Sequence, residues 1–493
     1  MSSTRRTILP DPAGLWGVTI FIILCSIGGA KALKDGDTLW HIRMGQEMIA
    51  RRAILKTDIF SHTAYGQPWH AHEWLSEILM AAMHDWAGLA GVTIFYLAII
   101  SLAFTVILKV TCKFANEYTA SLATAIALPS VYVHMLARPH IFTWLGAALT
   151  LFLLERGGRW PWLLIPISTI WANLHGGVLF GLVLQAIFWG GNCLDSYQDN
   201  ISNWLKTCWA KGKSALLILI ACVGATIINP FGYQIFLFPF KVASPVFAQG
   251  ISEWRAPDFQ ALWFSKPWAV GVVLAALWSG RKLPWRWNLL ALFLFWQTLS
   301  HARNLSLAAL LLIPYFSIFL RDILGGIAFW RRKITDGIDL LLSPWSGPIG
   351  IILLTLIFLS VIAEDTLGAR GFAKTSFPLA KENLDEVVAF LDKGYPEGNL
   401  YNDYEWGDYL IYAFKKPPLV FIDGRADMYG EDLFSEHNRI LNLDVGTDDL
   451  LVKYEIGWTL LPKESILNRN LRDCKGWELL YTDDFVEILK KSP

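Results

Sequence analysis

The chain has 493 residues, of which 54% are hydrophobic and 17% are charged, and it contains 24 tryptophans. A soluble globular protein of this length is less apolar and more highly charged, so the composition excludes an ordinary soluble domain and indicates a membrane protein. The formal net charge is zero and the basic residues are dispersed, so the sequence shows no basic cluster that would indicate nucleic-acid binding.

Apolar segments of about 17 to 25 residues can cross the hydrocarbon core of a bilayer as helices, and we count about eleven of them. They lie at residues 13–33, 86–110, 118–136, 139–155, 160–175, 176–194, 214–229, 266–280, 286–300, 304–320 and 347–364. The first one also fits a signal peptide, but its length favours an uncleaved helix.

Basic residues predict the orientation of these spans, because Lys and Arg accumulate in loops that stay in the cytoplasm. Alternate loops carry such residues, for example Lys113, Arg156 and Arg286. The long first loop also carries Arg43 and Arg51, which weighs against the rule. With an odd number of spans, the C-terminal region lies outside the cytoplasm.

We therefore expect two parts, a helical membrane body and a C-terminal soluble α/β domain. The body covers residues 1–364 and has outer loops at 34–85 and 230–265, and the domain covers residues 365–493. Within the domain, spacing predicts helices at 383–391 and 432–441 and strands at 419–422, 458–461 and 485–489.

The unusual polar residues fall at span ends that this count places on one side of the bilayer, the side opposite the cytoplasm. They are Asp35, Asp37, His70–Glu73, Arg138–His140, Asn173–His175, Asn229, Glu253–Arg255 and His301–Asn304. Such one-sidedness predicts a working face on the outer side.

The first outer loop carries the clearest candidate for catalysis. Asp35 and Asp37 follow the first span, and Asp37 and His41 are four residues apart, so they share one face of a predicted helix along the membrane surface. A carboxylate beside a histidine suits a general base or a metal ligand. The alternative for both aspartates is helix capping or solvation.

A second polar group lies further along this loop. His70 and Glu73 are three residues apart on a predicted helix start, and His72 lies between them. Asp37, His72 and Glu73 are our candidate ligands for a divalent metal such as Mg²⁺, Mn²⁺ or Zn²⁺. The spacing is a weak metal signal, and ordinary interfacial histidines are the alternative.

Arginines at the outer ends of spans are candidates for phosphate binding. Charge next to hydrocarbon is expensive, so such groups face a cavity or a partner, and guanidinium binds phosphate through two parallel hydrogen bonds. The predicted substrate-binding set at these ends is Arg138, His140, His175, Glu253, Arg255, His301, Arg303 and Asn304. Snorkelling of the arginines, or a structural pair with Glu253 or Asp258, stays open as an alternative.

Two motifs resemble a known family. Asp35-Gly36-Asp37 resembles the acidic motif of the GT-C glycosyltransferases, and Glu405-Trp406-Gly407-Asp408-Tyr409 is similar to the Trp-Trp-Asp-Tyr-Gly signature of the oligosaccharyltransferase catalytic subunit, with Gly and Asp offset. The wider pattern resembles bacterial GT-C-like membrane proteins, and protein mannosyltransferases more distantly.

This resemblance implies a multi-pass enzyme of the bacterial inner membrane that acts in cell-envelope glycosylation. The implied donor is a polyprenyl-phosphate-linked sugar, which enters from the membrane lipids, and the acceptor is a glycan, a lipid or a protein. Asp37 would then be the base, Arg303, Arg138 and Arg255 would hold the phosphate, and Asp408, Tyr409, Asp423 and Arg425 would bind the acceptor. Turn chemistry is the alternative for these last four residues.

Two other functions remain open from the sequence. A transporter or flippase for a lipid-linked saccharide would use a similar cavity, although charge inside the predicted spans is scarce. A non-catalytic scaffold of a polysaccharide assembly machine would need no base at Asp37.

Overall fold

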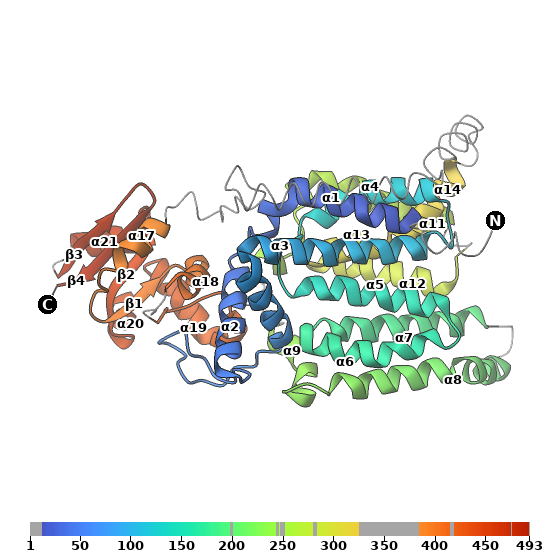
Figure 1. Ribbon diagram of the computed structural model, residues 1–493, viewed down its shortest axis with the longest axis horizontal. Helices are drawn as coiled ribbons and strands as arrows, with labels where there is room; N and C mark the ends of the chain where they lie inside the picture. Colours follow the sequence, from blue (N-terminus) through green and yellow to red (C-terminus); the bar gives the residue numbers. More distant parts are fainter. Residues whose placement is uncertain are drawn as a thin grey trace.

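The computed structural model describes residues 12–197, 201–242, 246, 252–279, 283–324, 384–414, 419–474 and 476–492. Figure 1 shows a bundle of roughly parallel helices with a smaller, sheet-containing part at one end. We call that end of the bundle the sheet end. The long helices are apolar and pack against one another, as expected for a membrane body.

The bundle is built from eleven of the described helices and their short connecting turns. The helices are α1 (Pro12–Ala32), α3 (Trp74–Thr111), α4 (Glu117–Tyr132), α5 (His140–Arg156), α6 (Leu164–Leu174), α7 (Val178–Asp195), α8 (Ile201–Thr226), α11 (Lys266–Ser279), α12 (Trp285–Ser300), α13 (Asn304–Leu311) and α14 (Ile313–Leu324). Between them lie the short segments η2 (Trp160–Leu163), η3 (Gly232–Phe236), α9 (Phe238–Val242), η4 (Ser252–Trp254) and η5 (Trp263–Ser265).

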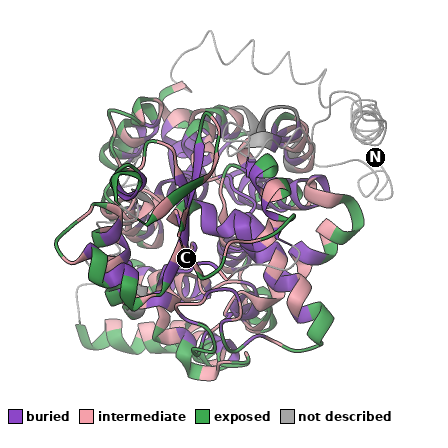
Figure 2. Ribbon diagram, turned by 90° about the vertical axis from the view of Figure 1, so that its left-hand side faces the viewer, coloured by how far each residue is buried: buried purple, intermediate pink, exposed green. Residues whose placement is uncertain are grey.

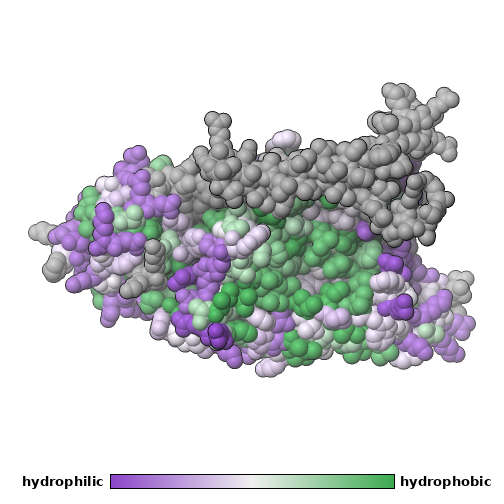
Figure 3. Space-filling model, viewed as in Figure 1, coloured by the Kyte–Doolittle hydropathy of each residue, from purple (hydrophilic) through white to green (hydrophobic). Residues whose placement is uncertain are grey.

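Among the described residues, fewer helices are long and apolar enough to cross a membrane than the eleven predicted. By length and composition, α3, α7 and α8 qualify, and α13 with α14, bent by 49°, would make a fourth span. Shorter apolar stretches lie at Trp16–Cys25 and Thr119–Tyr132. The predicted span at 347–364 lies outside the described residues. The hydropathy is nevertheless arranged as a membrane requires, with an apolar band between polar ends (Figure 3).

A break in α3 separates its first turns from its membrane-length part. Ala87 has a non-helical conformation and Gly88 has φ 62° and ψ −157°, a backbone conformation that favours glycine. The segment before the break packs beside α2 (Asp37–Arg51), which crosses the sheet end of the bundle (Figure 1). The predicted surface helix that carries Asp37 and His41 is therefore present.

Basic side chains gather at the opposite end of the bundle. Glu155 at the end of α5 accepts hydrogen bonds from Arg286 Nε at 2.8 Å and Trp287 Nε1 at 3.0 Å, and Lys113 Nζ lies 3.6 Å from its carboxylate. Two of the residues predicted to anchor cytoplasmic loops, Lys113 and Arg286, thus meet at one carboxylate, away from the acidic motif.

The sheet-containing part folds as an α/β unit. Its sheet has the order β1-β2-β4-β3, in which β1 runs parallel to β2 and the other pairs are antiparallel. The strands are β1 (Asn399–Asn402), β2 (Ile456–Pro462), β3 (Trp477–Thr482) and β4 (Val486–Lys491). The helices are α17 (Leu384–Leu391), α18 (Tyr404–Ala413), α19 (Ala426–Leu441), α20 (Thr447–Lys453) and α21 (Ile466–Asp473). Figure 2 views this part end-on, with the buried residues inside it.

Most of the predicted elements in this part are present, and one is wrong. The predicted strand at 419–422 is no strand, because Val420 makes only a single bridge, to Ser61 of the first outer loop. That segment is hydrophobic because it lies in the core, where Phe421 and Ile422 are fully buried. Strands β1 and β3 were not predicted.

The first outer loop and the α/β unit share one hydrophobic core. Leu39, Trp40 and Met44 of α2 pack in the same buried cluster as Leu410 of α18 and Trp458 of β2. The α/β unit is therefore packed against the bundle through the loop that carries the acidic motif.

Candidate active site

A cavity of about 1170 Å³ opens where α2, the sheet end of the bundle and the α/β unit meet. Most of the predicted site residues line it, although they come from distant stretches of sequence. Lining residues from the predicted set are Asp35, Asp37, His41, His72, Glu73, Arg138, His140, His175, Glu253, His301, Arg303, Asn304, Asp408 and Arg425.

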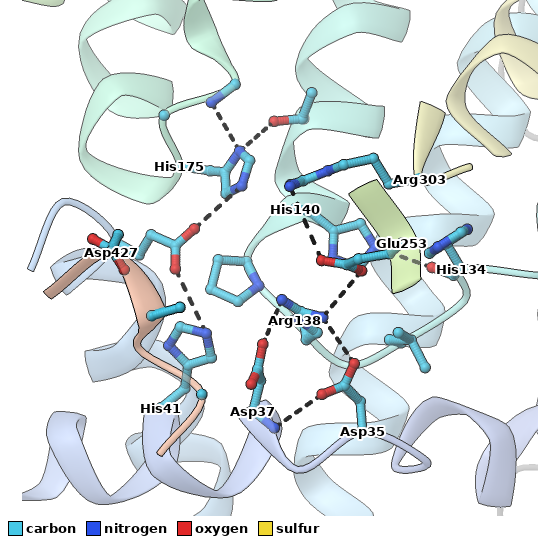
Figure 4. Close-up of a pocket in the computed structure, with 18 of the residues that line it drawn as sticks. Asp35, Asp37, His41, His134, Arg138, His140, His175, Glu253, Arg303 and Asp427 are labelled. Carbon is cyan, nitrogen blue, oxygen red and sulfur yellow. Dashed lines mark hydrogen bonds and ion pairs between the residues drawn. The ribbon is translucent and has the colours of Figure 1, made fainter. Parts of the chain in front are cut away.

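Arg138 is surrounded by carboxylates in the cavity (Figure 4). It leaves the turn between α4 and α5, and its NH1 lies 2.8 Å from Asp35 Oδ2 and 3.6 Å from Glu253 Oε2. Its NH2 pairs with Asp37. The acidic turn is ordered locally as well, since the Asp37 N–H donates to Asp35 Oδ1 at 3.0 Å.

Asp37 has a pKa near neutral pH because its carboxyl group is buried. Burial raises the pKa of Asp37 to about 7, Arg138 opposes that rise, and the carboxylates of Asp35 and Glu253 add to it. A carboxylate with such a pKa is matched to general base catalysis at physiological pH.

Arg303 is held differently from Arg138, on the other side of the cavity (Figure 4). It caps the start of α13, and its backbone N–H donates to the Glu253 carbonyl at 3.1 Å. Its guanidinium lies 4.5 Å from the centre of the Trp254 ring and 4.0 Å from Glu253 Oε1, and its side chain is 31% exposed. Arg303 therefore keeps hydrogen-bonding capacity directed at the cavity.

A third group of polar side chains surrounds Glu73. Its carboxylate lies 3.2 Å from His175 Nε2, 3.5 Å from His41 Nε2 and 3.7 Å from His72 Nε2. The Gly177 N–H donates to His175 Nδ1 at 2.9 Å, so the neutral ring carries its proton on Nε2, the atom that lies nearest to Glu73. Burial raises the pKa of Glu73.

The predicted metal ligands lie in the cavity but do not assemble a metal site. Within the described part of the chain, no group of three or more His, Cys, Asp or Glu side chains is arranged to hold a metal ion. Asp37 is engaged by Arg138, whose positive charge disfavours a second cation at the same carboxylate. The set of Asp37, His72 and Glu73 does not fit a metal in this arrangement.

The α/β unit supplies one wall of the cavity. The Gly424 N–H donates to Asp408 Oδ1 at 2.8 Å, and a Cβ atom on Gly424 would lie 2.4 Å from Asp37 Oδ1 and 2.9 Å from Asp408 Oδ2. The carboxyl groups of Asp37 and Asp408 therefore both lie close to the backbone of Gly424. Burial raises the pKa of Asp408 well above its usual range, and Asp37 and Asp423 add to that rise.

Three predicted residues lie outside the set that lines the cavity. Tyr409 donates its hydroxyl to Asp385, and Asp423 is fully buried, where it accepts from Arg425 Nε at 2.8 Å and from the Tyr429 hydroxyl at 2.5 Å. Arg255 contributes a backbone carbonyl, which accepts from the Ala302 N–H at 2.8 Å.

Sequence reasoning missed several residues of the site. Glu77, which lies 3.1 Å from His41 Nδ1, follows Glu73 by four residues, and this helical spacing could have revealed it. His134 also lines the cavity, four residues before Arg138. Gly424 carried no signal, because its role depends on contacts with Asp37 far away in sequence.

No protein-family model and no curated protein matches this sequence. Solved structures do match it. The oligosaccharyltransferase of Archaeoglobus fulgidus in its apo form aligns with 91% of this chain and 69% of its own, with a TM-score of 0.56 and 12% identity. The complex of AglB from the same organism with an inhibitory peptide and a dolichol-phosphate gives the same coverage and TM-score at 11% identity.

A second solved structure aligns with this chain over nearly the full length of both proteins. ArnT from Cupriavidus metallidurans in the apo state aligns with 96% of this chain and 97% of its own, with a TM-score of 0.50 and 12% identity. AglB and ArnT are both GT-C membrane glycosyltransferases. This chain has the GT-C fold. At such low identity the GT-C likeness concerns the fold alone, so any statement about the reaction must come from the residues of the cavity.

Proposed function

We propose that this protein is a membrane glycosyltransferase that moves a sugar from a polyprenyl-phosphate-linked donor to an acceptor outside the cytoplasm, in envelope glycan or glycoconjugate synthesis. The observation that carries the proposal is the convergence of Asp37, with its raised pKa, and Arg303, with its partly exposed guanidinium, on one cavity at one end of an apolar bundle. The GT-C fold supports it, and the related AglB was solved with a dolichol-phosphate.

Arg303 is the group that fits the donor phosphate best. Arg138 is already shared among Asp35, Asp37 and Glu253, and Arg425 is bound by Asp423 and Asp58. The Trp254 ring orients the Arg303 guanidinium by stacking against it, and this contact leaves the N–H groups of the guanidinium able to donate hydrogen bonds. An arginine placed in this way can form two parallel hydrogen bonds to a phosphate.

Asp37 is the base in this proposal. Its carboxylate takes the proton from a hydroxyl or amide of the acceptor as the acceptor atom attacks the anomeric carbon, and the bond from that carbon to the phosphate oxygen breaks. The phosphate leaves as an anion that Arg303 stabilises, so its departure needs no proton. Stabilisation of that charge contributes more than the base itself.

The two remaining groups complete the proposal. Glu73, with its histidines, offers oxygen and nitrogen atoms to the hydroxyl groups of a sugar. Asp408, on the wall formed by the α/β unit, is the predicted acceptor residue that stays at the cavity without an ion pair to an arginine among the described residues, whereas the Arg425 guanidinium is taken up by Asp58 and Asp423. Tyr409 and Asp423 support that wall from behind, through Asp385 and Arg425.

The test is sugar transfer by purified protein in detergent, with a polyprenyl-phosphate-linked radiolabelled sugar and a membrane extract as the source of acceptor. We expect wild-type protein to transfer label and Asp37→Asn to lose transfer while folding normally. Asp85→Asn, which changes an exposed carboxylate outside the cavity, is the matched control. Transfer by Asp37→Asn at the wild-type rate would exclude Asp37 as the base.

The same donor in liposomes separates transfer from transport. If labelled lipid crosses the bilayer with its sugar–phosphate bond intact, and no sugar is transferred in the detergent assay, the protein is a flippase and the proposal is wrong.

A further inference from the structure

Glu253 lies between the two cavity arginines without bonding tightly to either. Its carboxylate oxygens are 3.6 Å from Arg138 NH1 and 4.0 Å from Arg303 NH1, both beyond hydrogen-bond length (Figure 4). Its side chain is 22% exposed. Glu253 is therefore held by the charge of the arginines and not by direct hydrogen bonds, so another anion can take its place.

The charge of Glu253 is nevertheless fixed. Burial opposes its ionisation, but the guanidinium groups of Arg138 and Arg303 lower the pKa of Glu253 to about 2. Glu253 is therefore a carboxylate at every physiological pH.

The backbone keeps this carboxylate in place. The Arg303 N–H donates to the Glu253 carbonyl at 3.1 Å, and the Ala302 N–H donates to the Arg255 carbonyl at 2.8 Å. Between these two bonds, the Trp254 ring stacks against the Arg303 guanidinium and packs edge-on against His301. The second outer loop and the start of α13 thus form one unit that presents Glu253 to Arg303.

Arg303 depends on Glu253 more than Arg138 does. Among the described residues, Glu253 is the only carboxylate within 4.0 Å of Arg303, whereas Arg138 also contacts Asp35 and Asp37. If Glu253 withdrew, Arg138 would remain paired and Arg303 would be left with capacity for one negative charge. A phosphodiester carries one such charge.

We propose that Glu253 occupies the position of the donor phosphate on Arg303 and weakens binding at that position, because an incoming phosphodiester must displace it. This inference rests on the proposed function. A carboxylate and a phosphate repel each other, so both cannot share Arg303 at full strength.

The displacement weakens the binding of every phosphodiester by the same factor. Headgroups of ordinary membrane phospholipids are phosphodiesters too, and they surround the protein in large excess. A lipid that makes no further contacts with the cavity, through a sugar or a polyprenyl chain, therefore stays weakly bound at Arg303.

The experiment measures binding of two phosphodiester probes to purified protein in detergent without acceptor, a polyprenyl-phosphate-linked sugar and the phospholipid phosphatidylglycerol. Glu253→Gln keeps the shape of the side chain and removes its charge. We expect it to tighten binding of both probes by roughly three- to tenfold, the range of a partly exposed charge interaction. The difference in affinity between the two probes should not grow.

Two further variants control the measurement. Asp85→Asn removes an exposed carboxylate outside the cavity and should leave binding unchanged. Arg303→Lys should weaken binding, because an ammonium group cannot make two parallel bonds. Thermal unfolding of each variant reports whether it is folded.

The outcomes separate the inference from the proposed function. If Glu253→Gln leaves binding unchanged or weakens it while wild-type protein binds the polyprenyl-phosphate-linked sugar, Glu253 merely positions Arg303 and the inference is wrong. If neither wild-type protein nor any variant binds a polyprenyl-phosphate-linked sugar, the proposed function fails, and the inference fails with it.

Discussion

Asp37 combines two properties that a catalytic carboxylate needs, a fixed orientation and a raised pKa. Arg138 and the local turn with Asp35 fix its orientation, and burial raises its pKa to about 7. The ion pair with Arg138 favours the ionised form, so a share of Asp37 is available as a base near neutral pH.

The pH dependence of transfer follows from this pKa. A base acts only when deprotonated, so the transfer rate of wild-type protein should rise with pH through about 7 and then level off. Because Arg138 lowers the pKa of Asp37, Arg138→Gln should move this rise to higher pH. A rate profile measured at saturating donor checks both points. A flat profile, or a shift to lower pH in the variant, would contradict the assignment of Asp37 as the base.

At the scale of elements, the site depends on close contact between α2 and the segment that precedes α19. Gly36 and Gly424 are both at this contact, where a Cβ on Gly36 would lie 2.9 Å from Asp408 Oδ2. No larger residue fits at Gly424 without displacing Asp37 or Asp408.

Gly424→Ala should therefore reduce transfer while the protein stays folded. The added methyl group would meet Asp37 Oδ1 at 2.4 Å, and a shift of the base by a fraction of an ångström should lower the transfer rate by about tenfold or more. Gly224→Ala in α8, where nothing lies within 4 Å of the added atom, is the matched control. Equal initial rates for the two variants would show that this contact does not position the base.

The elements show what could be predicted from the sequence and what could not. Local spacing predicted α2 with Asp37 and His41 on one face, and the alternation of basic loops predicted that Lys113, Arg156 and Arg286 lie away from the acidic motif. The parallel pairing of β1 with β2 joins residues more than fifty positions apart, so no local pattern could reveal it. The segment at 419–422 was misjudged because a short apolar run looks the same whether it is a strand or a buried loop.

At the scale of the whole molecule, a buried ion network joins the first outer loop to the α/β unit. Arg425 NH1 donates to Asp58 Oδ1 at 2.8 Å and its NH2 donates to Asp423 Oδ2 at 2.6 Å, and all three side chains are nearly inaccessible. Asp58 belongs to the loop and the other two belong to the unit, so the network couples their positions. The family resemblance implied that Asp423 and Arg425 bind an acceptor, and only the fold reveals that both join Asp58 in a buried network.

Arg425→Met should loosen this junction. It leaves two buried carboxylates without their partner, which costs about 3–5 kcal/mol where such a pair is broken. Limited proteolysis should then cut the first outer loop of the variant at protease concentrations that leave the wild type intact, and the melting temperature should fall. Arg469→Met, which breaks an exposed pair with Glu464, is the control and should change neither. Protease resistance equal to that of the wild type would mean that the hydrophobic core alone holds the junction.

The sidedness of the molecule is what allows a single cavity to combine an acid, an imidazole group and an arginine from distant segments. The most direct test is an experimental structure of the protein with a polyprenyl phosphate bound. We predict phosphate density against the Arg303 guanidinium, in the cavity that Asp37 lines, with the lipid chain running along the apolar bundle. Phosphate density at the opposite end, near Arg286, would contradict the account.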